Sequence, residues 1–168
     1  DPENRLIIAT GPAAGFRKIA GSRWQICGKS PVSNPETFSY ANFGGSWGSR
    51  LKFAGYDVLI IQGASPTPVY LYINGDDVRI RDASRLWRKT TSATRSALKE
   101  ALGNKIKVLA TGPAGENLVS CATLLADEDS SGTGGFASVM GAKKLKAVAV
   151  YGDTRPEAAD PDGLARLS

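Results

Sequence analysis

The strongest constraint on the fold of this 168-residue chain is a five-residue segment that occurs twice. The segment Ala-Thr-Gly-Pro-Ala occupies residues 9–13 and again residues 110–114, each time directly after a short apolar run. In both places a Gly-Gly pair follows, at 44–45 and at 134–135, and leads through a helical pattern into a second apolar run. Chance reuse of turn residues is one explanation. The shared order of strand, turn, strand, helix and strand favours the other, an internal duplication into two related halves.

Apolar and turn patterns predict the secondary structure along the chain. Strands are expected at 6–9, 23–27, 37–41, 57–62, 106–110, 118–125 and 146–151, and helices at 91–102, at 136–141 and after Gly44-Gly45, where Trp47, Leu51 and Phe53 share an apolar side. Residues 69–73 and 78–81 flank Asn74-Gly75, a pair favoured in type I′ turns, and predict a β-hairpin; a loop that continues through Asp76 is the alternative. Strands and helices mix without regular βαβ alternation. We therefore predict an α+β fold of two related halves, with mixed sheets and short helices.

The composition excludes several classes of protein. The chain has no histidine, which excludes Ser-His-Asp and Cys-His catalysis and His-ligated metals within it. Cys27 and Cys121 are too few and too far apart for a metal motif; a disulfide between them is possible, but reduced thiols in the cytoplasm are the expectation. No apolar run is long enough to span a membrane. The net charge of +5 suits anionic ligands, although the basic residues lack the interleaved aromatics of a nucleic-acid surface.

Several segments are candidate ligand sites, and each has a structural alternative. A Gly-Gly pair at a helix start exposes N–H groups to an anion, so two related halves suit a ligand that is itself doubled. Arg23, in an apolar strand, needs either an acidic partner or a ligand anion, and Asn42 is a candidate helix cap. The acidic run 127–129 is interpreted as a solvated loop, with Mg²⁺ binding as the alternative, and the lysines at 143–146 as a solvated helix face.

Four blocks of sequence resemble a known family. They are LKFAGYD at 51–57, IRDAS at 80–84, GPAGEN at 112–117 and VMGxKxLKA at 139–147. In this order they resemble the N-terminal domain of the tungsten-containing aldehyde:ferredoxin oxidoreductase family, whose domain begins before residue 1. The resemblance implies a domain at 1–152 that forms the base for a tungsten or molybdenum bis-pterin, with a linker to the next domain at 153–168. In such a cofactor the pterin phosphates meet at a Mg²⁺, which supplies the doubled anionic ligand.

The resemblance also assigns site residues in the first half. Arg23 corresponds to the family's arginine at the pterin phosphates. Asn42 corresponds to the asparagine whose carbonyl faces the Mg²⁺. Gly44, with Gly45 beside it, corresponds to a backbone contact with the pterin.

In the second half the sequence departs from the family. The family's Arg-Ala pair corresponds to Asp129 and Ser130, and a later arginine corresponds to Thr133. Ser130 keeps the backbone contact and is expected to give Mg²⁺ its second carbonyl, whereas Asp129 reverses the charge. We therefore expect this half to hold its pterin or Mg²⁺ differently.

The resemblance implies that the whole protein oxidises aldehydes to carboxylic acids and passes electrons to ferredoxin through a 4Fe-4S cluster bound by domains outside this chain. The expected partners are ferredoxin, a small aldehyde or acyl substrate, the remaining domains of the polypeptide and a second copy in a homo-oligomer. The 168 residues alone are expected to be inactive. Two alternatives stay open: the tungsten subunit of a benzoyl-CoA type reductase, and a cofactor-less interaction domain, which the changes at Asp129 and Thr133 motivate.

Overall fold

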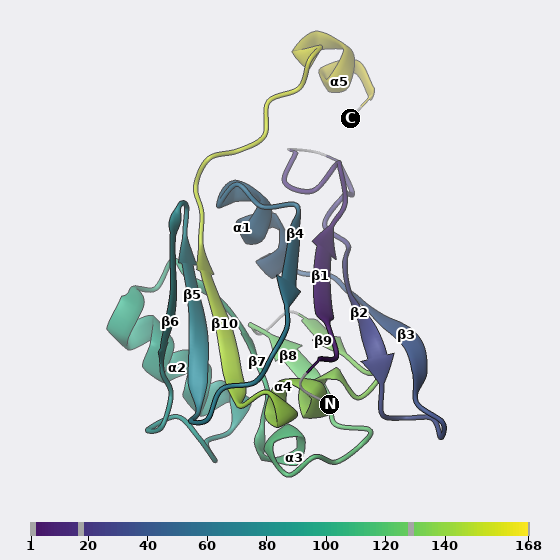
Figure 1. Cartoon of the computed structure of the whole chain (residues 1–168). Coiled ribbons are helices and arrows are strands. Elements are labelled where there is room, and N and C mark those ends of the chain that lie inside the picture. The colour runs from purple at the N-terminus through teal and green to yellow at the C-terminus, as the bar shows by residue number, and fades with distance from the viewer. Residues whose placement is uncertain (1–2, 17–18, 128–129, 168) are drawn as a thin grey trace.

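Two β-sheets share one apolar core in the computed structural model, which describes residues 3–16, 19–127 and 130–167 (Figure 1). The first sheet has the order β3 (Thr37–Phe43), β2 (Trp24–Ser30), β1 (Leu6–Thr10) and β4 (Val58–Ile61). The second has the order β6 (Asp77–Asp82), β5 (Val69–Asn74), β10 (Leu145–Tyr151), β7 (Lys107–Ala110), β8 (Leu124–Ala126) and β9 (Ser130–Gly132). The helices are α1 (Trp47–Phe53), α2 (Thr91–Leu102), α3 (Pro113–Glu116), α4 (Phe136–Ala142) and α5 (Pro161–Leu167). The predicted α+β class is confirmed.

The strand order confirms the internal duplication. The first sheet runs β3-β2-β1-β4, and four strands of the second repeat this order as β9-β8-β7-β10, all antiparallel. A helix precedes the last strand in both halves, α1 before β4 and α4 before β10. The register is also shared, because Ala9 pairs with Val58 as Ala110 pairs with Ala147. The two copies of the repeated segment therefore occupy equivalent places in the two sheets.

A hairpin and a helix lie between the two halves in the sequence. The predicted hairpin is present, but its two turn residues are Gly75, at φ +56°, and Asp76, because Asn74 ends β5 and pairs with Asp77. Strand β5 pairs in parallel with β10, which extends the second sheet to six strands. Helix α2 packs on the outer face of this sheet, where Leu98 joins a buried cluster with Val108 and Ala147 (Figure 1). The hairpin and α2 thus complete the second half.

Three aromatic side chains join the two halves in the core. Trp24 stacks on Phe43 at 4.2 Å between ring centroids and lies 4.7 Å from Trp47. The indole N–H of Trp47 donates to the carbonyl of Val148 in β10 at 3.2 Å, and that of Trp24 donates to the carbonyl of Gly44 at 2.7 Å. Buried indole N–H groups need such acceptors. The bond of Trp24 fixes the Gly-Gly segment to the core, and the bond of Trp47 fixes the second half to it.

Two predictions about the second half were wrong. Residues 118–125 are not one strand, because Leu118 has φ +59° and the chain turns before β8 begins. The lysines at 143–146 do not form a solvated helix face, since Lys143 and Lys146 are buried. The ammonium of Lys143 donates to the carbonyl of Gly63 at 2.9 Å, and Lys146 has a carboxylate partner described below. Hydrogen-bond acceptors inside the protein offset the cost of burying these two ammonium groups. The sequence does not show where such acceptors lie.

Beyond Tyr151 the chain leaves the sheets, and α5 stands apart from them (Figure 1). No helix within the described ranges is both long and apolar enough to cross a bilayer.

Candidate functional site

The predicted first-half residues meet at one end of the first sheet. Asn42 in β3 lies opposite Gln25 in β2, and the Gln25 amide donates to Asn42 Oδ1 at 2.8 Å. Arg23 precedes β2 directly, and the repeated turn brings Thr10 and Gly11 to the same end. These five residues line a cavity of about 220 Å³. The antiparallel register of β1, β2 and β3 therefore assembles a polar pocket from three separate segments.

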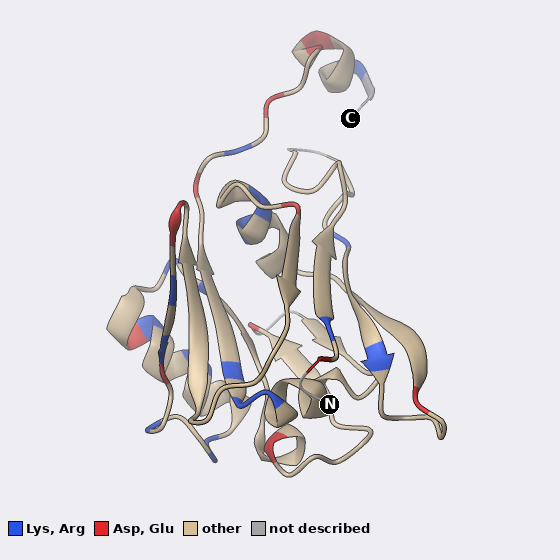
Figure 2. Ribbon diagram, in the orientation of Figure 1, with Lys and Arg blue, Asp and Glu red and all other residues tan. Residues whose placement is uncertain are grey.

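The predicted positions of two residues in the first half were wrong. Arg23 lies outside the strand that was predicted to contain it, and its side chain is exposed. Within the described residues no carboxylate pairs with its guanidinium, so the charge can meet an anion at the cavity. Asn42 is not a helix cap, because it lies in β3 and the N-cap of α1 is Ser46. Lys and Arg are spread over both halves (Figure 2). The cavity lining includes Arg23, which supplies its positive charge.

The two halves contact each other beside this pocket. The backbone N–H of Gly44 donates to Ser130 Oγ at 2.9 Å, while its carbonyl accepts from Trp24. Gly132 in β9 packs against the ring of Phe43 in β3, where a Cβ would lie only 2.1 Å from ring atoms. The edge strands β3 and β9 therefore approach closely. The structure thus brings together Ser130 and Gly44, and Gly44 lies two positions after Asn42 in the chain.

The second half does not reproduce the polar side chains of the first. By strand register, Thr123, Leu125 and Ser131 take the places of Arg23, Gln25 and Asn42. These counterparts are uncharged, and so is the exposed Thr133. Asp129, which was predicted to contact the cofactor, lies outside the described residues. The duplicated backbone thus presents a cationic pocket in one half and neutral side chains at the equivalent place in the other.

The acidic run contributes a structural anchor. The buried carboxylate of Asp127 pairs with Lys107 at 2.6 Å and Lys99 at 3.4 Å, and accepts from the N–H of Val108 at 3.1 Å. These partners occupy the carboxylate, so it is not the solvated side chain that the sequence predicted. No cluster of three or more His, Cys, Asp or Glu suited to a metal occurs in the described ranges. A cation here would therefore need backbone carbonyls or the ligand itself as its donors.

A buried ion pair supports the second repeated turn. Lys146 in β10 pairs with Glu116 of α3, and its ammonium donates to the carbonyl of Lys89 at 2.7 Å. Both side chains are almost fully buried. Burial lowers the pKa of Lys146, and the hydrogen bond to Glu116 only partly offsets this effect. The pair fixes α3 to the sheet and does not face the cavity.

Sequence reasoning missed Gln25 as a site residue. Nothing in its local pattern marks it, because its neighbours predict an ordinary strand with alternating exposure. Its role depends on the cross-strand pairing with Asn42, which becomes visible only when β2 and β3 are aligned.

The fold and this cavity define a duplicated α+β domain with a cationic pocket beside the junction of its halves. The profile of the family described as aldehyde ferredoxin oxidoreductase, N-terminal domain, matches residues 1–152. The chain belongs to this family, as the sequence blocks indicated.

Similar proteins include oxidoreductases with different activities in their names. The tungsten-containing aldehyde ferredoxin oxidoreductases of Thermococcus kodakarensis and Pyrococcus furiosus are 47% and 44% identical over 161 residues, which is 95% of this chain and 26% of each relative. The active-site complex BamBC of benzoyl coenzyme A reductase, solved with 1,5-dienoyl-CoA, has a chain with a TM-score of 0.94 and 40% identity, over 99% of this chain and 25% of that one. The chain therefore spans about a quarter of the length of these relatives.

Proposed function

We propose that this domain holds the phosphates of a tungsten bis-pterin cofactor in a protein that oxidises aldehydes to carboxylic acids with ferredoxin as electron acceptor. The observation that carries the proposal is the cavity of about 220 Å³ with Arg23, Gln25 and Asn42 in its lining. The relatives that are 44–47% identical are named as tungsten-containing aldehyde oxidoreductases, which supports this cofactor and reaction over the alternatives.

The residues of the first half fit an anionic group of this kind. The Arg23 guanidinium is a planar donor that matches two phosphate oxygens. Gly44 has open space where a Cβ would be, so a ligand can approach its backbone closely. We assign Arg23 to the phosphates, Gly44 and Gly45 to backbone contacts with a pterin, and the carbonyls of Asn42 and Ser130 to Mg²⁺.

The second half has no described cation at the counterpart of Arg23. We therefore assign most of the charge compensation to the first half, and backbone contacts to the second. When bound, the tungsten and its pterins supply the redox chemistry, while the protein supplies orientation and charge. The 4Fe-4S cluster is assigned to domains outside this chain, which residues 153–168 would connect to this one.

The wider assignment concerns the whole protein. Its partners would be ferredoxin, a small aldehyde and a second copy of the chain, in the cytoplasm. A reductase of aromatic acyl-CoA thioesters is the second candidate, favoured by the TM-score of 0.94 to the benzoyl coenzyme A reductase chain. The substrate cavity outside this domain decides between the two.

Metal and phosphorus analysis of the full-length protein tests the proposal. We expect tungsten, iron and phosphorus in the wild type, and aldehyde-dependent reduction of ferredoxin without reduction of benzoyl-CoA. Arg23→Ala should lower the tungsten and phosphorus content, because a phosphate loses its charge partner. Lys29→Ala removes an exposed cation from the other end of β2, where it pairs with Glu36, and should leave that content unchanged. Wild-type protein with iron but no tungsten would contradict the proposal and favour the cofactor-less alternative.

A further inference from the structure

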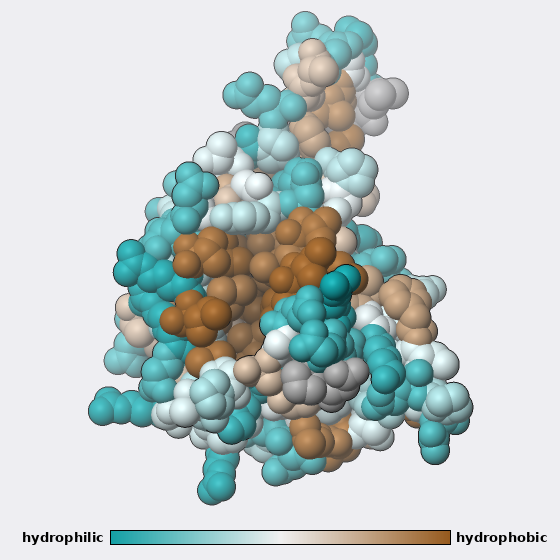
Figure 3. All heavy atoms as spheres, in the orientation of Figure 1, coloured by the Kyte–Doolittle hydropathy of each residue, from teal (hydrophilic) through white to brown (hydrophobic). Residues whose placement is uncertain are grey.

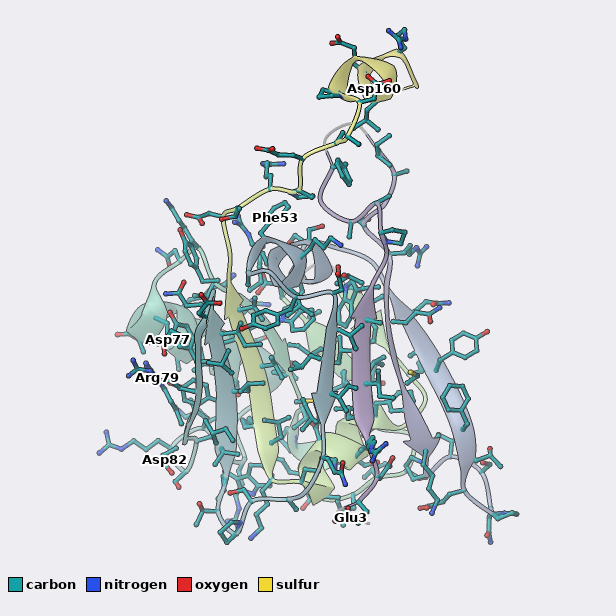
Figure 4. The ribbon with its side chains drawn as sticks, turned by 45° about the horizontal axis from the view of Figure 1, so that its top comes forward. Glu3, Phe53, Asp77, Arg79, Asp82 and Asp160 are labelled. Atoms are coloured by element: carbon teal, nitrogen blue, oxygen red, sulfur yellow. The ribbon has the colours of Figure 1, made fainter. Side chains whose placement is uncertain are left out.

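A second charged cavity lies between α1 and the chain that follows β10. Its volume is about 290 Å³, and its lining includes Arg50 and Phe53 of α1 together with Arg155. Figure 4 shows Phe53 at the end of the molecule from which the chain runs on to Asp160. None of these three lining residues belongs to the cavity of Arg23, so the two cavities are separate candidates for a ligand.

Two guanidinium groups converge on one aromatic ring in this cavity. The guanidinium carbon of Arg50 lies 5.8 Å from the centroid of the Phe53 ring, and that of Arg155 lies 5.2 Å from it. The ring attracts each cation, but the two positive charges repel each other. A bound anion would offset this repulsion.

The charges of both arginines are available to a ligand. Among the described residues, neither guanidinium forms an ion pair with a carboxylate. Asp153, two residues before Arg155, instead accepts a hydrogen bond from the hydroxyl of Tyr151 at 3.0 Å. Arg50 donates to a neutral group, the carbonyl of Gly152, at 2.6 Å. The folded domain therefore leaves two positive charges at this cavity without a described acid to balance them.

The duplicated fold does not require a cation at this place. Helices α1 and α4 each have seven residues and precede the last strand of their half, so Arg50 corresponds to Val139 and Phe53 to Ala142. Val139 is buried in the core. The second half thus builds the equivalent helix with an apolar residue, and the charged cavity is a feature of the first half.

An apolar cavity adjoins the charged one. Its volume is about 260 Å³, and the linings of the two cavities share Phe16 and Arg155. Figure 3 shows apolar side chains gathered on the side of α5 that faces the body of the molecule. The chain from β10 into α5 contributes apolar residues to the lining, namely Pro156, Ala158, Pro161 and Leu164. The two cavities together suit a molecule with an anionic head and an apolar body.

We propose that these two cavities bind an organic acid. Its carboxylate lies between Arg50 and Arg155, because a guanidinium group matches the two oxygens of a carboxylate. Its aliphatic or aromatic group lies against Phe16 and Leu164. Apart from Arg155, the described lining of the apolar cavity has no polar side chain, which favours a hydrocarbon group over a sugar or a base. This class includes the acids that the proposed reaction releases, and only that link rests on the proposed function.

Titration calorimetry of the full-length protein tests the charge requirement. Benzoate is the probe, and benzamide, which has the same ring without the charge, is its control. Arg155→Gln should weaken benzoate binding about tenfold, the effect of losing one charge-assisted hydrogen bond. Arg155 is exposed, so the variant should keep the fold, and Lys29→Ala, which removes an exposed cation elsewhere, should bind as the wild type does. Equal binding of benzoate and benzamide, or equal binding of benzoate by Arg155→Gln and the wild type, would overturn the proposal.

Photo-labelling locates the bound acid. A diazirine-bearing benzoate should label residues 156–164 of the full-length protein, as identified by peptide mass spectrometry. Excess benzoate should prevent this labelling, whereas excess benzamide should not. Absence of label from residues 156–164, or undiminished labelling of Arg155→Gln, would contradict the assignment. Protein prepared without tungsten should give the same results, so failure of this proposal is distinguishable from failure of the proposed function.

Discussion

The backbone N–H of Gly44 and the side-chain hydroxyl of Ser130, 86 residues apart in the sequence, form a hydrogen bond of 2.9 Å. The bond joins the two duplicated halves beside the cavity of Arg23 and Asn42. It also fixes the backbone segment to which the pterin contact is assigned. The position of Gly44 therefore depends on a residue of the other half.

Replacement of Ser130 tests this junction. Ser130→Ala leaves the Gly44 N–H without its acceptor and should lower the free energy of unfolding by about 1 kcal/mol, the usual net value of such a bond. The tungsten content of the full-length protein should fall as well, because Gly44 is less well fixed. Ser131→Ala alters the adjacent, exposed residue of β9 and is the control. Equal stability and metal content in both variants would contradict a role for the hydroxyl.

Gly132 is predicted to tolerate no side chain. A Cβ at this position would lie 2.1 Å from the ring of Phe43, which is fully buried and stacked on Trp24. Because the ring cannot move aside, Gly132→Ala should cost about 1–3 kcal/mol, as overpacking of a core does. In Gly112→Ala the nearest atom is 3.5 Å away, and that variant should stay within about 0.5 kcal/mol of the wild type. Chemical denaturation of the full-length variants measures the difference.

The buried pair of Lys146 and Glu116 is predicted to be costly to break. Lys146→Met leaves a buried carboxylate without its cation and should destabilise the protein by about 3 kcal/mol or more. The double variant Lys146→Met/Glu116→Leu removes both charges and should recover most of this loss. A double-mutant cycle, measured by chemical denaturation, gives the coupling energy between the two side chains. Additive effects of the two single substitutions would show that the pair is not energetically coupled.

The thiol of Cys27 is predicted to lose its proton at a higher pH than an ordinary cysteine thiol. Burial raises its pKa above the ordinary value of 9.0. Because the thiolate is the reactive form, the rate of alkylation should reach half its maximum above pH 9.0. The unfolded thiol ionises first, which means that the folded protein binds more protons in this range. Its contribution to the free energy of unfolding therefore falls as the pH rises through 9.0. Peptide mass spectrometry after alkylation at increasing pH, with Cys27→Ser as the blank, checks this. Half-maximal alkylation at or below pH 9.0 would disprove it.

Much of the architecture was predictable because it depends on residues close together in the chain. The two copies of Ala-Thr-Gly-Pro-Ala predicted the duplication, and the strand order of both sheets confirms it. Asn74-Gly75 predicted the hairpin, since such a pair favours a tight turn, although the turn residues are Gly75 and Asp76. Residues 118–125 were misassigned, because apolar residues in a turn and in a strand look alike locally.

By itself, then, the sequence determined the α+β class, the duplication and the family. Only the tertiary structure decided which residues meet: Gln25 with Asn42 and Gly44 with Ser130. It also decided that Lys146 is buried, since its acceptors belong to α3 and to the loop before α2. The physical reason is that turn and strand preferences act between neighbours in the chain. Cross-strand register, close backbone approach and charge burial depend on partners that folding brings together.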